Sequence, residues 1–174
     1  MRDERGATAV EVGLLALPFF TIIGAILETA LIFLSGQILD SAVQDTSRFI
    51  RTGQMQAAKY DIEQFRTNMC GRLYGLFKCA DLHIEVQVLN SFNAVNIKAP
   101  VNPSCTSTDK EVCPDWSRTE SWQPGQGSSV IAVQVYYRWP IMLNFGGLSL
   151  ANMPNNIRIM GAAAVFRNEP FAGG

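Results

Sequence analysis

The pattern of hydrophobic and polar residues changes twice along the chain. Residues 12–39 are almost continuously apolar and include one charged residue, Glu28. A helix over these 28 residues would extend about 42 Å, and about 20 residues suffice to cross a hydrocarbon core. Because the run is apolar on all sides, it predicts a transmembrane helix rather than an amphipathic surface helix. A buried core helix is the alternative, but so short a chain has little with which to surround it.

Helical spacing continues beyond the apolar run. Apolar residues recur at intervals of three and four through residues 42–50, and Thr52-Gly53 can end the helix with glycine as C-cap. A second helix is predicted over residues 55–77. Its apolar stripe, which we expect to pack on a sheet, consists of Ala58, Ile62, Phe65, Met69, Leu73 and Leu76.

The hydrophobic period then shortens to two, which indicates strands. Residues 82–88 alternate between apolar and polar types, as in a half-buried strand. His83 falls on the polar side of this strand, so we expect it at the surface and outside any site. Further strands are predicted at residues 92–97, 130–139 and 157–166, the first of them as a hairpin partner.

These elements together predict an α+β fold. A long N-terminal transmembrane helix continues into a domain with a second helix and an antiparallel sheet of about four strands. A polar loop over residues 100–129 contains Trp116 and Trp122. These two side chains either dock on a partner or fold back over the edge of the sheet.

Composition and charge exclude several classes of function. Charged residues make up 17% of the chain, hydrophobic residues 48%, and the net charge is −1. The chain therefore lacks the basic footprint of a nucleic-acid-binding protein. A single histidine excludes a multi-histidine metal site, and the motifs of hydrolases, zinc proteases, nucleotide-binding loops and dinucleotide folds are missing. We therefore expect neither an enzyme nor a cofactor or metal.

Four cysteines follow the apolar run. An even number of cysteines in an extracytoplasmic domain indicates two disulfides, for which three pairings exist. The local pairs Cys70–Cys79 and Cys105–Cys113 are favoured, and each would stabilise the fold by about 2.5 kcal/mol in the chain-entropy model. Their spacings do not suit zinc. The cysteines therefore favour a C-terminal domain on the oxidising side of the membrane.

A short charged leader, residues 1–6, precedes the apolar run. The run is longer than the core of a cleaved signal peptide and lacks its small-residue cleavage site, so it predicts a retained anchor. The leader ends in Gly6, and Glu11 follows five residues later. This layout resembles the processing site of type IV prepilins. The resemblance implies a cut between Gly6 and Ala7, with Glu11 fifth in the mature chain; Val12 stands where the pilin pattern usually has phenylalanine.

The position of Glu11 has a physical rationale. A carboxylate beside an apolar helix is costly to bury alone. The new amino group on Ala7 of an incoming subunit would neutralise it in one axial register. We therefore predict that Glu11 acts in assembly. Glu28 has no positive partner in the sequence, so we expect it to face a polar group on a partner helix.

Several segments extend the resemblance over the chain. The GATAVE start, Glu28 in its GAILE context, residues 39–54 and residues 166–171 are similar to the TadE-like proteins of tight-adherence pilus systems. This similarity implies a minor pilin-like (pseudopilin) subunit that takes part in pilus assembly and cell adhesion. The implied partners are a prepilin peptidase, other pilin-like subunits, the pilus assembly platform and membrane lipid.

The resemblance also implies a location. The chain is expected as a single-pass protein of the bacterial inner membrane with a periplasmic C-terminal domain, or in or at the tip of an extracellular pilus. The expected parts are the leader (1–6), the transmembrane helix (7–39) and the periplasmic pilin-like domain (40–174). The alternative function is a membrane-tethered periplasmic binding module that is not part of a filament.

Overall fold

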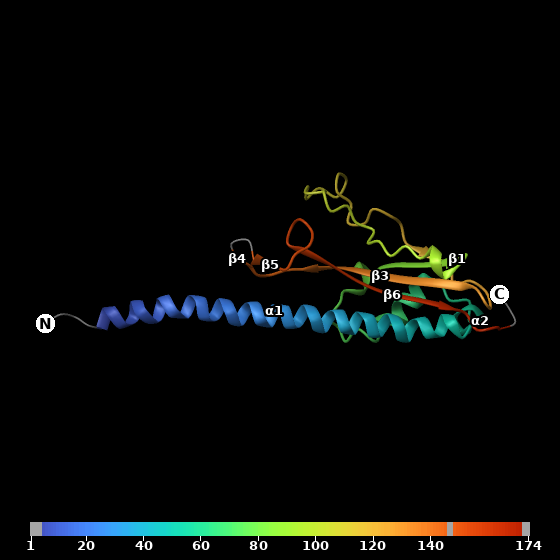
Figure 1. Cartoon of the computed structure of the whole chain (residues 1–174), viewed down its shortest axis with the longest axis horizontal. Coiled ribbons are helices and arrows are strands. Elements are labelled where there is room, and N and C mark those ends of the chain that lie inside the picture. Colours follow the sequence, from blue (N-terminus) through green and yellow to red (C-terminus); the bar gives the residue numbers. More distant parts are fainter. Residues whose placement is uncertain (1–4, 146–147, 172–174) are drawn as a thin grey trace.

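The computed structural model describes residues 5–145 and 148–171. One helix, α1 (Arg5–Arg51), runs along most of the length of the molecule, and a four-stranded sheet lies along its C-terminal half (Figure 1). The N-terminal half of α1 extends beyond this sheet. Its 47 residues correspond to about 70 Å of helix. The fold is α+β, as expected.

The end of α1 follows the sequence prediction. The helix ends at Arg51, and Gly53 has a φ of 76°, the left-handed conformation that favours glycine. The Gly53 N–H donates to the Ile50 carbonyl at 3.0 Å. The ring of Phe171 lies so close that a Cβ at position 53 would be 2.6 Å from its Cγ. Glycine is therefore required here both by conformation and by space.

The single helix predicted over residues 55–77 is wrong. The segment forms two short helices, α2 (Gln54–Ala57) and α3 (Ile62–Cys70), followed by turns. Lys59 has a positive φ of 53°, which breaks the first helix. Asp61 then starts α3 with a capping box: its carboxylate accepts from the Gln64 N–H at 2.8 Å, and the Gln64 side chain accepts from the Asp61 N–H at 2.9 Å. Periodicity alone missed this local signal.

Four strands form the main sheet in the order β2-β1-β3-β6. They are β1 (His83–Leu89), β2 (Ser121–Trp122), β3 (Val130–Pro140) and β6 (Ile157–Arg167). The pairs β1–β3 and β3–β6 are antiparallel, whereas the short β2 runs parallel to β1, so the sheet is mixed. A small hairpin, β4 (Asn144–Phe145) and β5 (Leu148–Ser149), lies in the connection from β3 to β6.

The predicted strand at residues 92–97 is also wrong. This segment contains a short 3-10 helix, η2 (Phe92–Ala94), and β2 takes the place beside β1 that a hairpin partner would have filled. Another 3-10 helix, η1 (Cys79–Asp81), leads into β1. The edge of the sheet is thus completed by a strand that lies more than 30 residues further along the chain.

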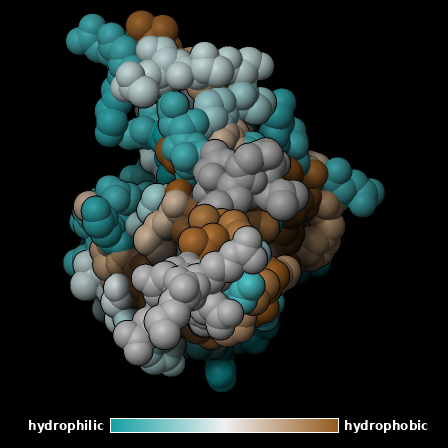
Figure 2. Space-filling view, turned by 90° about the vertical axis from the view of Figure 1, so that its left-hand side faces the viewer, coloured by the Kyte–Doolittle hydropathy of each residue, from teal (hydrophilic) through white to brown (hydrophobic). Residues whose placement is uncertain are grey.

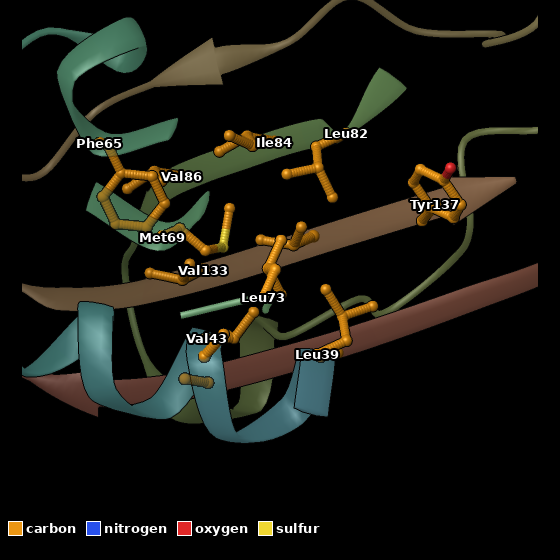
Figure 3. Close-up of a cluster of buried hydrophobic side chains, with 14 of the residues drawn as sticks. Leu39, Val43, Phe65, Met69, Leu73, Leu82, Ile84, Val86, Val133 and Tyr137 are labelled. Atoms are coloured by element: carbon orange, nitrogen blue, oxygen red, sulfur yellow. The ribbon is translucent and has the colours of Figure 1, made fainter. Parts of the chain in front are cut away.

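The hydrophobic core lies between the sheet and the helices. Alternate residues of β1 and β3, such as Ile84 and Val133, point toward Leu39 and Val43 of α1, and Phe65 and Met69 of α3 close the other side (Figure 3). On β6, Ala162 and Ala164 are buried against α1. Their small side chains let the helix approach the sheet closely.

The long loop covers the opposite face of the sheet. In Figure 1 the segment that leads into β2, coloured yellow-green to yellow, lies on the side of the sheet away from α1. The polar face of β1 is therefore an interior surface rather than a solvated one. This arrangement changes the environment of His83, which the sequence assigned to the surface.

Candidate functional site

The exposed half of α1 is the most distinctive surface of the molecule. Large apolar side chains from Val10 to Leu34 project outward. None of the 18 residues in the most apolar stretch of the helix is buried. The same helix is long and apolar enough to cross a membrane. Exposed apolar surface of this extent marks a membrane or protein contact.

Pro18 lies within this exposed half without ending the helix. Proline has no N–H, so the helix loses one backbone hydrogen bond at this turn. Thr21, in the next turn, donates its hydroxyl to the Leu17 carbonyl at 2.8 Å, which satisfies this polar side chain within the helix. Prolines of this kind are tolerated in membrane helices, where side chains and neighbours satisfy the freed groups.

The residues of the predicted processing site lie at the start of α1. Gly6, Ala7 and Glu11 are all helical, and residues 1–4 of the leader lie outside the described residues. Glu11 is exposed, and among the described residues it has no ion-pair partner.

Among the described residues, Glu28 is the first along α1 that is buried. It is 5% exposed, and its carboxylate accepts hydrogen bonds from the backbone N–H of Met142 at 2.6 Å and of Leu143 at 3.2 Å. The sequence had assigned it to a polar group on a partner helix. The structure instead supplies its donors from the same chain. Beyond Glu28 the buried face of α1 consists of Ile32, Ser35, Leu39, Ala42, Val43, Thr46, Ser47 and Ile50.

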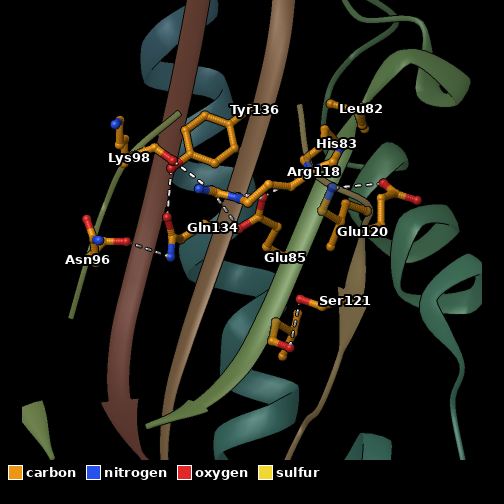
Figure 4. Close-up of polar contacts among 12 residues, drawn as sticks. Leu82, His83, Glu85, Asn96, Lys98, Arg118, Glu120, Ser121, Gln134 and Tyr136 are labelled. Carbon is orange, nitrogen blue, oxygen red and sulfur yellow. Dashed lines mark hydrogen bonds and ion pairs between the residues drawn. The ribbon is translucent and has the colours of Figure 1, made fainter. Parts of the chain in front are cut away.

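A buried polar cluster lies between the sheet and the loop. His83 Nε2 is 3.1 Å from Glu85 Oε1, and both Glu85 oxygens accept from Arg118 Nη2 at 3.1 Å (Figure 4). Arg118 also donates to the Lys98 carbonyl at 2.8 Å. His83 and Glu85 are each 2% exposed. The prediction that His83 lies at the surface is therefore wrong, because the loop covers the polar side of β1.

Tyr136 belongs to the same cluster. Its hydroxyl donates to Gln134 Oε1 at 2.7 Å, and its ring lies over Gly161, where a Cβ would be 2.9 Å from the ring. Burial raises the pKa of the Tyr136 phenol above its ordinary value of 10.0, and the negative charge of Glu85 raises it further, while Arg118 opposes both.

A partly buried ion pair attaches β2 to the domain. Arg66 of α3 lies 2.6 Å from the Glu120 carboxylate and donates to the Leu82 carbonyl at 2.5 Å. Glu120 in turn accepts from the Ile84 N–H at 2.8 Å. Sequence reasoning singled out neither Arg66 nor Glu120. Neither residue stands out in the sequence, because single charged residues in a helix or loop are usually solvated.

The two loop tryptophans pack within the molecule. The ring of Trp116 stacks on His83 with centroids 4.6 Å apart, and Trp122 packs on Phe65 at 5.1 Å. Trp122 Nε1 also donates to the Tyr60 carbonyl at 2.9 Å. Of the two readings that the sequence left open, the structure favours folding back over the sheet.

The cysteines are joined as the two local pairs. Cys70–Cys79 connects the end of α3 to η1, just before β1, and Cys105–Cys113 closes a turn within the long loop. Neither pair lies near the exposed half of α1. Among the described residues, no cluster of three or more His, Cys, Asp or Glu side chains is arranged to hold a metal ion.

Comparison with known proteins identifies the part of the chain that contains this exposed helix. Residues 6–48 match the family model described as "TadE-like protein". The match covers most of α1, including Gly6, Glu11 and Glu28. No curated protein and no solved structure matches the chain.

Proposed function

We propose that this protein, which is TadE-like over residues 6–48, is a minor pilin-like subunit that is processed by a prepilin peptidase and assembles through the exposed half of α1. The TadE-like segment ties the chain to the tight-adherence pilus, and this pilus family is structural rather than enzymatic. The finer role as a processed subunit is our inference. The observation that carries it is the projection of an apolar half-helix from a folded α+β domain.

The dimensions of α1 support this role. From Ala7 to Leu27, the residue before the buried Glu28, 21 residues extend about 31 Å. This length matches the roughly 30 Å thickness of a hydrocarbon core. The proposed location is therefore the bacterial inner membrane, with the disulfide-containing domain in the periplasm. The same apolar surface packs against other pilin-like helices when the subunit leaves the bilayer.

In this proposal, Glu11 sets the axial position of one subunit's helix relative to the helix of the next subunit. Its exposed carboxylate has no ion-pair partner among the described residues, so it is free to pair with the amino group that cleavage would create on Ala7 of another subunit. A membrane-tethered binding module would need the anchor but neither the cleavage site nor this carboxylate. Processing therefore distinguishes the two functions.

The experiment is an intact-mass measurement of the protein from its native host. The expected mature chain begins at Ala7, and Gly6→Val blocks the cut. Gly13→Val is the matched control, because a side chain at position 13 meets nothing within 4 Å and the position lies outside the processing site. Finding full-length chain for the unmodified protein, in cells whose peptidase processes its major pilin, would overturn the proposal.

A further inference from the structure

A segment of 19 residues between Arg138 and Arg158 has no charged side chain. It joins β3 to β6 and includes the β4–β5 hairpin, and nothing in the proposed assembly role accounts for it. Its larger apolar residues are Trp139, Ile141, Met142, Leu143, Phe145, Leu148, Leu150 and Met153. Residues 146 and 147 lie outside the described residues.

This segment lies beside the exposed half of α1 rather than beside the core. Its Met142 and Leu143 amides donate to Glu28, and a Cβ at Gly24 would be 3.0 Å from Leu143 Cδ1. Leu143 and Leu150 also line an apolar pocket with Thr21 of α1. The segment thus reaches about two helical turns beyond Glu28, toward the N-terminus of α1.

The surface of the segment is apolar and open. Met142 is 77% exposed, one of the most exposed large apolar side chains outside α1. Figure 2 views the molecule from this end, and hydrophobic residues lie near the centre of the face with hydrophilic ones mostly around its periphery. This surface is continuous with the exposed apolar side chains of α1, since both contribute to the same pocket.

The base of the segment has the composition of a membrane boundary. Trp139 of β3 pairs with Arg158 of β6, and Arg138 pairs with Ile159. Tryptophan and basic residues gather where a bilayer meets water. Arg138 forms an ion pair with Asp115, and Arg158 donates to the Leu150 carbonyl at 2.7 Å. Both arginines therefore lie between the uncharged segment and the charged domain.

The position of β6 beside α1 shows where this boundary lies along the helix. The Met160 side chain lies beside Gly36, and two strand residues rise about as far as four helix residues, so Arg158 is about level with Ile32. From Leu27, the domain end of the proposed span, to Ile32 the helix rises about 8 Å, so the arginine pair lies at the level of the lipid headgroups.

We propose that this uncharged segment is a second membrane contact, which lies in the lipid interface beside α1 through Met142, Leu143 and Leu150. The inference rests on α1 spanning the bilayer, as in the proposed function. The cost of placing non-helical backbone among lipid is reduced because its amides are already bonded: Met142 and Leu143 donate to Glu28, and Ile141 donates to the Asn156 carbonyl at 2.7 Å. Two contacts, the helix and the segment, fix the orientation of the domain above the membrane.

The test uses full-length protein in vesicles of phosphatidylethanolamine and phosphatidylglycerol, with and without bromine on the acyl chains. Met142→Trp places a fluorophore on the segment, and the unmodified protein gives the background emission of Trp116, Trp122 and Trp139. The emission added by Met142→Trp should be mostly lost in brominated lipid. Val112→Trp, at a site that is 67% exposed in the distant loop, should keep its added emission.

Leu15→Trp serves as the control for the anchor, because Leu15 is 72% exposed on α1. Quenching at position 15 without quenching at position 142 would overturn this inference and leave the anchor standing; the segment would then face water or a protein partner. Absence of quenching at both positions would overturn the membrane span itself. All three substitutions are at exposed sites, and an unchanged circular dichroism spectrum checks that each variant is folded.

Discussion

Glu28 shows how a single residue joins two parts of the molecule. A carboxylate within an apolar helix requires hydrogen-bond donors, and a hairpin connection has backbone amides that require acceptors. Here the Met142 and Leu143 amides donate hydrogen bonds to the Glu28 carboxylate, so donors and acceptor are both satisfied. The contact also brings Leu143 against Gly24, where a larger residue would be crowded. One side chain therefore positions the β3–β6 connection along the exposed half of α1.

Tyr136 makes a residue-scale prediction about pH. Its folded-state pKa is raised by burial, so the folded protein holds the phenolic proton more tightly than the unfolded chain does. The resulting stability is fully present below the unfolded pKa of about 10 and is lost as pH rises toward the folded value. We expect the free energy of unfolding to fall above pH 10, and to fall less in Tyr136→Phe.

Denaturant unfolding of the detergent-solubilised protein at several pH values measures this effect. At neutral pH, Tyr136→Phe should cost about 1 kcal/mol for the lost hydrogen bond to Gln134. Tyr74→Phe is the control, because Tyr74 is 81% exposed. An alkaline decline of equal size in Tyr136→Phe and in the unmodified protein would contradict the assignment.

At the scale of elements, the two disulfides play different parts. Cys70 packs against the core cluster, and its bond to Cys79 joins the end of α3 to the start of β1. Cys105 and Cys113 lie in the loop that covers the outer face of the sheet. The chain-entropy model assigns the two bonds similar energies because their loops are of similar length. Their positions nevertheless predict different consequences when each is removed.

Cys70→Ser/Cys79→Ser should lower the global free energy of unfolding by about 2–3 kcal/mol, since α3 and β1 both bury core residues. Cys105→Ser/Cys113→Ser should instead increase amide hydrogen exchange within residues 100–120 and affect global unfolding less. Each double variant is the control for the other. Equal losses of global stability, without local exchange in the loop, would show that the loop unfolds only with the whole domain.

At the scale of the whole molecule, the two halves of α1 differ in their surroundings. Its C-terminal half forms one wall of the core, and its N-terminal half is exposed and apolar. A substitution in the exposed half is therefore expected to change assembly without changing the fold. Glu11 is the residue at which this separation can be tested most directly.

Glu11→Ala should leave membrane insertion and the folded domain intact but abolish or strongly reduce pilus production or incorporation of the subunit. Without this carboxylate, the amino group of an incoming subunit has no partner near the membrane, where an unpaired charge costs on the order of 3 kcal/mol at mid-helix and less at the interface. Complementation of a deletion strain, with surface pili and subunit level scored together, measures it. Glu111→Ala in the exposed loop is the matched control. Normal piliation with Glu11→Ala would show that this carboxylate has no role in assembly.

Local features of the sequence determined several elements correctly. The apolar run specified α1, the alternation in residues 82–88 specified β1, and Gly53 ended the helix, because each depends on residues close in sequence. The cysteine pairs are local for the same reason. The capping box at Asp61 was also present in the sequence, but the longer apolar stripe around it suggested one continuous helix. Cleavage after Gly6 and the role of Glu11 stay predictions.

The tertiary structure decided what covers each surface. The sequence showed that His83 and Glu85 lie on the polar side of β1, but only the fold shows that the loop carrying Trp116 and Arg118 buries that side. It likewise showed a carboxylate at position 28 without its donors, which lie more than 100 residues away in the chain. Periodicity reports which side of an element is apolar. Whether water, lipid or another segment meets the other side depends on contacts between distant residues, and these form only when the chain folds.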